Sequence, residues 1–240
     1  MSETRLNIDI WSDIACPWCY IGKRRFETAL NALPFAEKVD VTWHSYQLDP
    51  TLPENYAGSE LDYLTKAKGM DPAQLQQMLG HVTEQAAAVG LRYDFDGLKV
   101  ANSFNAHRLL HLAKAHGKGE QVKEALLAAH FVKGLNTGDA ATLTEIGVAA
   151  GLPGDEVEAV LSSDQYADAV RADIEQARAM GISGVPFFVL EGKYGISGAQ
   201  PVEVFEQAMT QVWEEIGGTT LQMMAPASAD GAACGPEGCN

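Results

Sequence analysis

The sequence has 240 residues, 46% of them hydrophobic and 20% charged, a composition typical of a folded globular protein with a sizeable core. Its 32 acidic residues against 17 basic ones give a formal net charge of −15, which would repel phosphate backbones and anionic lipids. We therefore expect neither nucleic acid nor membrane as a partner. The four cysteines form two close pairs, too few for a small scaffold held together by disulfides.

Strand patterns occur near both ends of the chain. Apolar and polar residues alternate over residues 6–11 and again over residues 39–46, which is the period of a half-buried strand. Two shorter strands are predicted near the C-terminus, over residues 187–190 and 194–197. A turn at Glu191-Gly192-Lys193 joins them.

Helix patterns fill most of the chain between these strands. One predicted helix covers residues 17–31, directly after the first strand, and a last one covers residues 201–216. One of the helices between has the capping-box spacing at its start, Thr142-Leu143-Thr144-Glu145. Most of the intervening helices end at a glycine, and they cover residues 72–89, 103–116, 120–133, 142–150, 155–162 and 165–180.

This order of elements predicts an α/β fold built from both ends of the chain. We expect one discontinuous domain from residues 1–55 and 176–216, interrupted by an all-helical insertion over residues 56–175. Residues 217–240 have weak structure signals and are rich in small residues. We expect them to form a flexible tail that carries a second cysteine pair.

The motif Cys16-Pro17-Trp18-Cys19 follows the first predicted strand and opens a helix. Two cysteines three residues apart at a helix start lie on one turn, close enough to form a disulfide. Unpaired N–H groups and the helix dipole at that end lower a thiol pKa, so we expect Cys16 to be the exposed attacking thiolate and Cys19 the deeper resolving thiol. Pro17 suits the first helical position, Trp18 is expected to shape the active-site surface, and Tyr20 either does the same or packs.

Two other interpretations of this pair are a structural zinc half-site and two unrelated buried thiols. A zinc site needs two further ligands, typically a second cysteine pair or two histidines at short spacing, and neither occurs with that regularity. The position between a strand and a helix favours redox chemistry instead.

A strand is followed by Cys-Pro-Trp-Cys, a helix, a second strand and the helical insertion. Gly184-Val185-Pro186 then precedes a strand-turn-strand-helix unit. The order of these elements resembles that of the DsbA family of thiol–disulfide oxidoreductases. The resemblance covers roughly residues 5–216. The chain is most similar to the FrnE-like subgroup, which is related to 2-hydroxychromene-2-carboxylate isomerases and kappa-class glutathione transferases. Residues 102–109 resemble a helix start of that subgroup. The implied fold is thioredoxin-like with a large inserted all-helical domain.

The resemblance also implies that Pro186 is preceded by a cis peptide bond and faces the dithiol, exposing the backbone of Val185 to a substrate chain. Reduction potentials in such proteins range from about −270 mV for thioredoxin to about −120 mV for DsbA. The intervening residues Pro17 and Trp18 match neither extreme. We therefore expect an intermediate potential, which suits isomerase or reductase work.

Cys234 and Cys239 enclose four residues that include two glycines and a proline, which permits a tight closed turn. A disulfide closing so short a loop adds only about 2 kcal/mol of stability. A second redox pair, which exchanges with Cys16 and Cys19, is the preferred interpretation. A structural disulfide and a metal-binding tail are the alternatives.

Two further groups invite a functional interpretation. Lys23, Arg24 and Arg25 form the densest cationic run, and we expect a solvated helix face. His107 and His111 lie one helical turn apart, but no acidic third ligand accompanies them in a recognisable pattern. We expect these histidines to be helix-surface or packing residues, and we expect no metal site.

The function predicted from these features is a protein thiol–disulfide oxidoreductase or disulfide isomerase. Protein thiols and disulfides would be its substrates and thioredoxin or glutathione its reductant, with no cofactor beyond glutathione as a co-substrate. The alternative is a glutathione-dependent isomerase or transferase of small aromatic compounds; a stoichiometric thiol-rich chaperone or metal buffer is a third interpretation. No targeting or membrane segment is recognisable, so we expect a cytoplasmic monomer that acts under oxidative stress.

Overall fold

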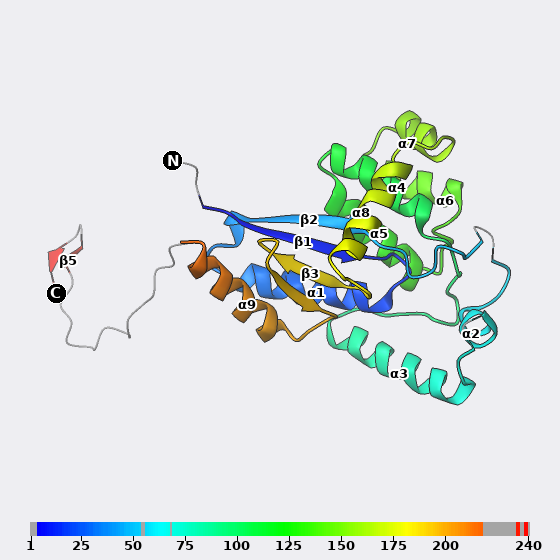
Figure 1. Cartoon of the computed structure of the whole chain (residues 1–240), viewed down its shortest axis with the longest axis horizontal. Helices are drawn as coiled ribbons and strands as arrows, with labels where there is room; N and C mark the ends of the chain where they lie inside the picture. The colour runs from blue at the N-terminus through cyan, green and yellow to red at the C-terminus, as the bar shows by residue number, and fades with distance from the viewer. Residues whose placement is uncertain (1–3, 54–55, 68, 218–233, 236–237, 240) are drawn as a thin grey trace.

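The computed structural model of this chain describes residues 4–53, 56–67, 69–217, 234–235 and 238–239 (Figure 1). The predicted flexible tail, residues 217–240, lies outside the described part apart from Gly217 and two short strands near the C-terminus. Among the described residues, no helix is long and apolar enough to cross a membrane.

Four strands form one mixed sheet in the order β2-β1-β3-β4. β1 pairs in parallel with β2 and antiparallel with β3, and β3 pairs antiparallel with β4. The strands that lie together thus come from the two ends of the chain, as the alternation predicted. They are β1 (Leu6–Ser12), β2 (Val39–Ser45), β3 (Phe187–Leu190) and β4 (Tyr194–Ser197).

The predicted long helices are all present, with ends that differ by a few residues. They are α1 (Pro17–Ala32), α3 (Pro72–Ala88), α4 (Phe104–Ala115), α5 (Gly119–Phe131), α6 (Ala140–Ala149), α7 (Gly154–Leu161), α8 (Ala167–Ala179) and α9 (Val202–Glu215). The sequence patterns did not predict three short helical turns. They are a 3₁₀ turn (Ala36–Lys38), α2 (Glu60–Asp62) and the π-helical turn that follows it (Tyr63–Ala67).

The two faces of the sheet are covered by different helices (Figure 1). Ile8 and Ile10 of β1 pack with Phe26 of α1 and Phe205 of α9 on one face. Trp11 points to the other face, where it joins a small cluster that includes Ala177 of α8. The largest buried cluster lies in the helical part, among α3 to α7, and includes the N-terminal turns of α1.

One predicted helix start is wrong by two residues. The spacing of Thr142 to Glu145 suggested a capping box, but α6 begins at Ala140 after an Asp139 N-cap. The Asp139 carboxylate accepts hydrogen bonds from both the backbone N–H and the hydroxyl of Thr142, each at 2.9 Å. A carboxylate satisfies the free N–H groups of the first turn and interacts favourably with the helix dipole, which explains why the helix starts earlier.

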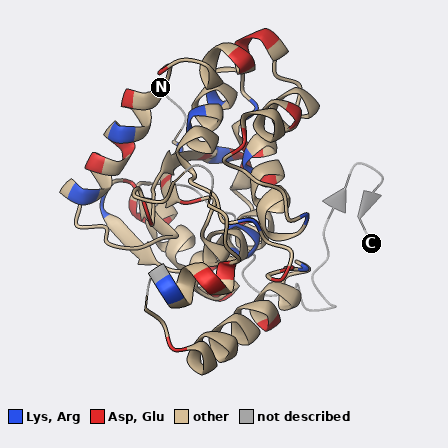
Figure 2. Ribbon diagram, turned by 90° about the vertical axis from the view of Figure 1, so that its right-hand side faces the viewer, with Lys and Arg blue, Asp and Glu red and all other residues tan. Residues whose placement is uncertain are grey.

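The expectation that Lys23 lies on a solvated face is also wrong. Lys23 is only 2% exposed, and its ammonium group lies 2.5 Å from Glu27, 2.5 Å from Glu120 and 3.0 Å from Glu124. Arg24 pairs with Glu124 and Glu27 beside it. Two of these three carboxylates belong to α5, so the cationic run ties α1 to the helical insertion. Elsewhere in the described part, Figure 2 shows basic residues dispersed among acidic ones on several helices.

His44 of β2 makes a second connection between the sheet and the insertion. Its Nε2 lies 2.7 Å from Asp9 Oδ1, and its Nδ1 lies 3.0 Å from Oδ1 of Asp173 on α8. Burial lowers the pKa of His44, but hydrogen bonds to the two carboxylates and their charges outweigh it and raise this pKa above its ordinary value. Asp173 also accepts hydrogen bonds from the backbone N–H of Ser45 and, at its carbonyl, from the indole of Trp11.

α1 approaches the residue before β3 closely because position 22 is glycine. A Cβ on Gly22 would lie 2.8 Å from Cγ of Pro186 and 3.4 Å from Cβ of Ala199. Glycine is usually unfavourable inside a helix, so its presence here reflects this contact. It allows Pro186 to rest directly on the helix that begins with the cysteine motif.

We expect Gly22→Ala to destabilise the protein by about 1–3 kcal/mol, because the added methyl group overpacks the contact with Pro186. Gly80→Ala is the matched control. Gly80 lies within α3, and a Cβ there would meet nothing within 4 Å. That change should stabilise the helix by about 0.5–1 kcal/mol. Urea unfolding of the reduced proteins measures both, and midpoints that move in the same direction would contradict the packing argument.

Candidate active site

The cysteine motif lies at the junction predicted from the sequence. Cys16 is the N-cap residue of α1 in an extended conformation (φ −99°, ψ 112°), and Pro17 occupies the first turn. The backbone N–H of Cys19 donates to the carbonyl of Cys16 at 3.0 Å, which closes that turn. Both residues are free thiols. Proline fits here because the first helical position needs no N–H donor.

Val185, the residue before Pro186, lies against the dithiol, although it is about 170 residues away in sequence. The Sγ–H of Cys16 donates to the carbonyl oxygen of Val185 at 3.4 Å, across a sequence separation of 169 residues. The Val185–Pro186 peptide bond is cis, as the family resemblance implied. The carbonyl of Pro186 accepts a hydrogen bond from the backbone N–H of Gly198 at 2.8 Å, which attaches this segment to β4.

Cys16 is not the exposed sulfur that the sequence suggested. Cys16 is only 4% exposed, and Cys19 is 1% exposed. Cys16 instead lines a partly open cavity together with Pro17, Trp18 and Val185, whereas Cys19 does not reach it. The two thiols therefore differ in access as predicted, but a reacting group must enter the cavity to meet Cys16.

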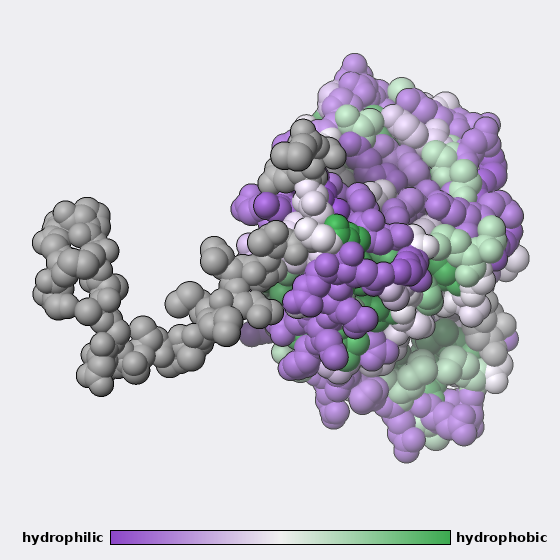
Figure 3. Space-filling model, turned by 60° about the vertical axis from the view of Figure 1, so that its left-hand side comes forward, coloured by the Kyte–Doolittle hydropathy of each residue, from purple (hydrophilic) through white to green (hydrophobic). Residues whose placement is uncertain are grey.

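The cavity has a volume of about 430 Å³, within the range of small-molecule sites. Its walls come from the dithiol turn, the segment after β2, the short helix α2, α3 and the segment before α4. Figure 3 shows hydrophobic surface around a hollow low on the body, at the height of α3 in Figure 1. Leu48 and Leu52, which precede the insertion, line the cavity as well. The larger apolar side chains of the insertion that line it are Tyr63, Leu64, Met78, Leu79, Val82, Phe95 and Val100.

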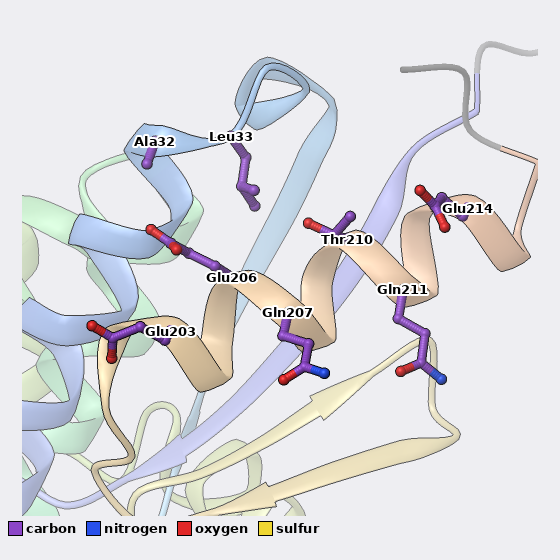
Figure 4. Close-up of a pocket in the computed structure, with 8 residues that line it drawn as sticks. All are labelled: Ala32, Leu33, Glu203, Glu206, Gln207, Thr210, Gln211 and Glu214. Carbon is purple, nitrogen blue, oxygen red and sulfur yellow. The ribbon is translucent and has the colours of Figure 1, made fainter. Parts of the chain in front are cut away.

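A second hollow, of about 620 Å³, lies on the opposite part of the fold, over α9 and the end of α1 (Figure 4). Its lining includes Glu203, Glu206 and Glu214, with Ala32 and Leu33 at the edge. It contains neither a thiol nor a buried titratable group that could act as a nucleophile. The cavity at Cys16 is therefore the candidate site.

A buried lysine lies close to the dithiol, and the sequence analysis missed it. Lys123 of α5 is 1% exposed, and its ammonium group has no hydrogen-bond partner. The ammonium lies 5.3 Å from the centre of the Trp43 ring. A signal was present in the sequence: Lys123 shares a helix face with Leu126 and His130, at the spacing of a buried stripe.

A carboxylate is also enclosed near the thiols. Asp13 is 1% exposed and accepts hydrogen bonds from the backbone N–H of Leu48 at 2.8 Å and of Ala15 at 3.3 Å. Nε2 of His107 lies 3.2 Å from its Oδ1. Burial would raise the pKa of Asp13, but these hydrogen bonds lower it below its ordinary value.

The electrostatics of the pair differ from the expectation that Cys16 is the acidic thiol. The hydrogen bond to Cys19 raises the pKa of Cys16 well above its ordinary value, and burial and the Asp13 carboxylate act in the same direction. Burial also raises the pKa of Cys19, but the hydrogen bond from Cys16, the Lys123 ammonium and the Ser12 hydroxyl lower it overall. Burial in turn lowers the pKa of Lys123 to about 8.

The pKa values of the two thiols are thus shifted in opposite directions, upward for Cys16 and downward for Cys19. Within the pair a negative charge is favoured on Cys19, near Lys123, and a proton on Cys16. A proton shift from Cys16 to Cys19 converts this state into one with a thiolate facing the cavity. The arrangement supports nucleophilic attack by Cys16 with Cys19 as its proton acceptor.

The other predicted residues occupy identifiable places. Trp18 lines the cavity, whereas Tyr20 packs and donates a hydrogen bond to Glu124 at 2.5 Å. His107 and His111 are packing residues: the first contacts Asp13, and the second lies near Asp173. No group of three or more potential ligands for a metal ion occurs among the described residues.

The second cysteine pair lies on two short strands, β5 (Cys234–Gly235) and β6 (Gly238–Cys239). They pair antiparallel, with Cys234 directly opposite Cys239. Residues directly opposite in such a pair have Cα atoms about 4.5–5.5 Å apart, which a disulfide can span.

The chain is 44% identical to a probable DsbA oxidoreductase from Streptomyces coelicolor, with 98% of this chain and 99% of that one covered and a TM-score of 0.84. The fold is also that of the cytosolic disulfide reductase DsbM from Pseudomonas aeruginosa, solved with GSH (21% identity, 86% and 98% coverage, TM-score 0.63). A 2-hydroxychromene-2-carboxylate isomerase shares it as well (16% identity, 88% and 98% coverage, TM-score 0.65).

The model of the DSBA-like thioredoxin domain matches residues 7–210, which include the dithiol, the helical insertion and the cis proline. Sequence, sheet topology and the position of the cysteines agree: this chain belongs to the DSBA-like thioredoxin domain family of oxidoreductases.

Proposed function

We propose that this chain is a protein thiol–disulfide oxidoreductase that works as a disulfide isomerase or reductase. One observation carries the proposal: two free thiols sit at a helix start, and only Cys16 of the two opens into an apolar cavity. The carbonyl of Val185 beside Cys16 offers a hydrogen-bond acceptor to an extended substrate chain.

The exchange proceeds in two balanced steps. The Cys16 thiolate attacks a substrate disulfide, so that an S–S bond forms to Cys16 and the substrate's other sulfur leaves as a thiolate. The Cys19 thiolate then attacks Cys16, which releases the second substrate thiolate and leaves a Cys16–Cys19 disulfide. The substrate disulfide is reduced and the protein dithiol is oxidised. An external thiol, that of thioredoxin or of a small-molecule reductant, restores the dithiol.

Protein segments are the favoured substrates because apolar side chains continue from the cavity to the surface. Leu48 and Met78 line the cavity and are 49% and 39% exposed. Exposed apolar patches of this kind bind unfolded or flexible chains. The similarity in fold to a cytosolic disulfide reductase supports a cytoplasmic setting.

A glutathione-dependent isomerase of small aromatic compounds is the second candidate. The apolar cavity of about 430 Å³ favours it, since an aromatic substrate would fit, and a 2-hydroxychromene-2-carboxylate isomerase shares the fold. The complete Cys16–Cys19 pair argues against it, because that isomerisation needs no resolving thiol. Turnover of a chromene substrate without insulin reduction would favour this alternative.

Cys16→Ser tests the central role of the dithiol. We expect this variant to lose reduction of insulin and reactivation of scrambled ribonuclease, because it removes the thiol that lines the cavity. Cys19→Ser should instead accumulate mixed disulfides with substrate, since the resolving thiol is absent. Mass spectrometry after acid quenching detects them. Insulin reduction by Cys16→Ser at the wild-type rate would refute the proposed function.

Lys123→Met tests the origin of the acidic thiol. Removing the buried cation should raise the pH at which the first thiol of the pair ionises by about one unit, because the thiolate loses its counter-charge. The same change should stabilise the oxidised protein by about 1 kcal/mol, since a buried ammonium without a hydrogen-bond partner is costly. Alkylation rates across pH and urea unfolding measure the two effects.

Lys133→Met is the matched control for this experiment. It removes the same charge from an exposed position just beyond α5. We expect neither the alkylation profile nor the unfolding midpoint to move appreciably. Equal alkylation profiles for the two variants would rule out a role for Lys123 in thiol acidity.

The tail pair is proposed as a second redox couple that relays oxidising equivalents to or from the first. Combined Cys234→Ser and Cys239→Ser changes should slow catalytic turnover with insulin while leaving the single-turnover reaction of Cys16 intact. The experiment compares the steady-state rate of insulin reduction with the rate of the first, stoichiometric turnover, in the variant and in the unmodified protein. Unaltered turnover would leave the structural disulfide or a metal-binding tail as the remaining interpretations.

A further inference from the structure

The cavity at Cys16 has an unusual balance of charge. Three carboxylate residues line it, namely Asp13, Asp49 and Glu60. Among the described residues of its lining, none is a lysine or arginine, and His130 has its pKa lowered by burial to about 4. The nearest buried cation, Lys123, does not line the cavity and lies with the thiol pair instead.

Two of the three carboxylates already have donors. Asp13 accepts hydrogen bonds from backbone N–H groups, as described above. Asp49 accepts from the hydroxyl of Tyr63 at 2.6 Å and from the backbone N–H and hydroxyl of Thr51. The carboxylates of Asp13 and Asp49 are thus held by hydrogen-bond donors of the protein itself.

Glu60 differs from both. No hydrogen bond or ion pair holds its carboxylate among the described residues, and burial alone raises its pKa to about 7. The main chain around it is fixed, because the Ser59 side chain caps the short helix α2 and the Asp62 side chain returns the bond. A carboxylate at a cavity wall without an internal partner is a site for a donor or a cation from outside.

We propose that Glu60 makes this cavity select thiols and disulfides whose substituents are neutral or positively charged, and discriminate against anionic ones such as glutathione. An anionic substituent would lose its hydration in an apolar cavity and face a carboxylate at close range. An ammonium or hydroxyl group would instead supply the donor that Glu60 lacks. This inference rests on the proposed exchange at Cys16 and names its substrate class.

The discrimination is measurable in the reduction of the Cys16–Cys19 disulfide by small thiols. The first thiolate forms a bond to Cys16, and the electron pair of the broken bond remains on Cys19. A second thiolate attacks the mixed disulfide, which frees Cys16 as a thiolate and releases the disulfide of the small thiol. Two small thiols are oxidised for each protein disulfide reduced.

The experiment compares three thiols with the same two-carbon skeleton: 2-aminoethanethiol, 2-mercaptoethanol and 2-mercaptoethanesulfonate. Each rate with the full-length oxidised protein at pH 8 is divided by the rate with an oxidised peptide containing the Cys-Pro-Trp-Cys motif. The division removes intrinsic differences in nucleophilicity. We expect the cationic thiol to exceed the anionic one by at least about tenfold, with the neutral thiol between them.

Glu60→Gln should reduce that ratio to below about threefold, because the amide keeps the shape of the side chain but carries no charge. Glu206→Gln on α9 is the control: it changes the net charge equally at the distant hollow of Figure 4 and should leave the ratio unchanged. Far-UV circular dichroism and reduction by dithiothreitol check that each variant is folded and active.

The outcomes separate the two proposals. Equal normalised rates for the three thiols, or a faster anionic thiol, would overturn the charge selection while leaving disulfide exchange at Cys16 intact. A wild-type protein whose disulfide none of the thiols reduces, dithiothreitol included, would overturn the proposed function itself. The order of rates in the unmodified protein decides the matter even if Glu60→Gln fails to fold.

Discussion

The ammonium group of Lys123 is enclosed near the dithiol with no hydrogen-bond partner, and the chemistry of the site depends on this placement. A lone buried cation is costly, and a thiolate close to it lowers that cost. Lys123 helps to lower the pKa of Cys19, whereas the pKa of Cys16 is raised. The buried ammonium group of Lys123 lowers the stability of the fold but favours ionisation of the cysteine pair. Such a compromise is common at functional sites.

The thiols and the residues that surround them come from different parts of the fold. The sheet and α1 present the thiols and the cis proline, whereas α5 brings Lys123, and α2 and α3 close the cavity. The ion pairs of Lys23 with Glu120 and Glu124 fix α5 against α1. The insertion therefore does more than cover the dithiol: it supplies the charge that tunes the thiols and the walls that receive a substrate.

The sequence was sufficient for the parts of the site that depend on local order. The strand–Cys16–Pro17–helix junction is read from spacing alone, and β3 and β4 have the predicted bounds. Charged residues were the source of error. A lysine in a helix is normally solvated, so the burial of Lys23 follows only from partners about 100 residues away in sequence. The burial of Lys123 is indicated in the sequence only by the apolar face that it shares with Leu126. Glu60 lies on a three-residue helix that no periodicity could reveal.

α1 takes part in two separate hydrophobic clusters. Its first turns, with Tyr20 and Ile21, belong to the cluster of the insertion, while Phe26 and Ala29 belong to that of the sheet. The walls of the cavity can therefore diverge between relatives without disturbing the packing that holds the strands. A scaffold divided in this way lets evolution exchange the substrate while retaining the same sulfur chemistry.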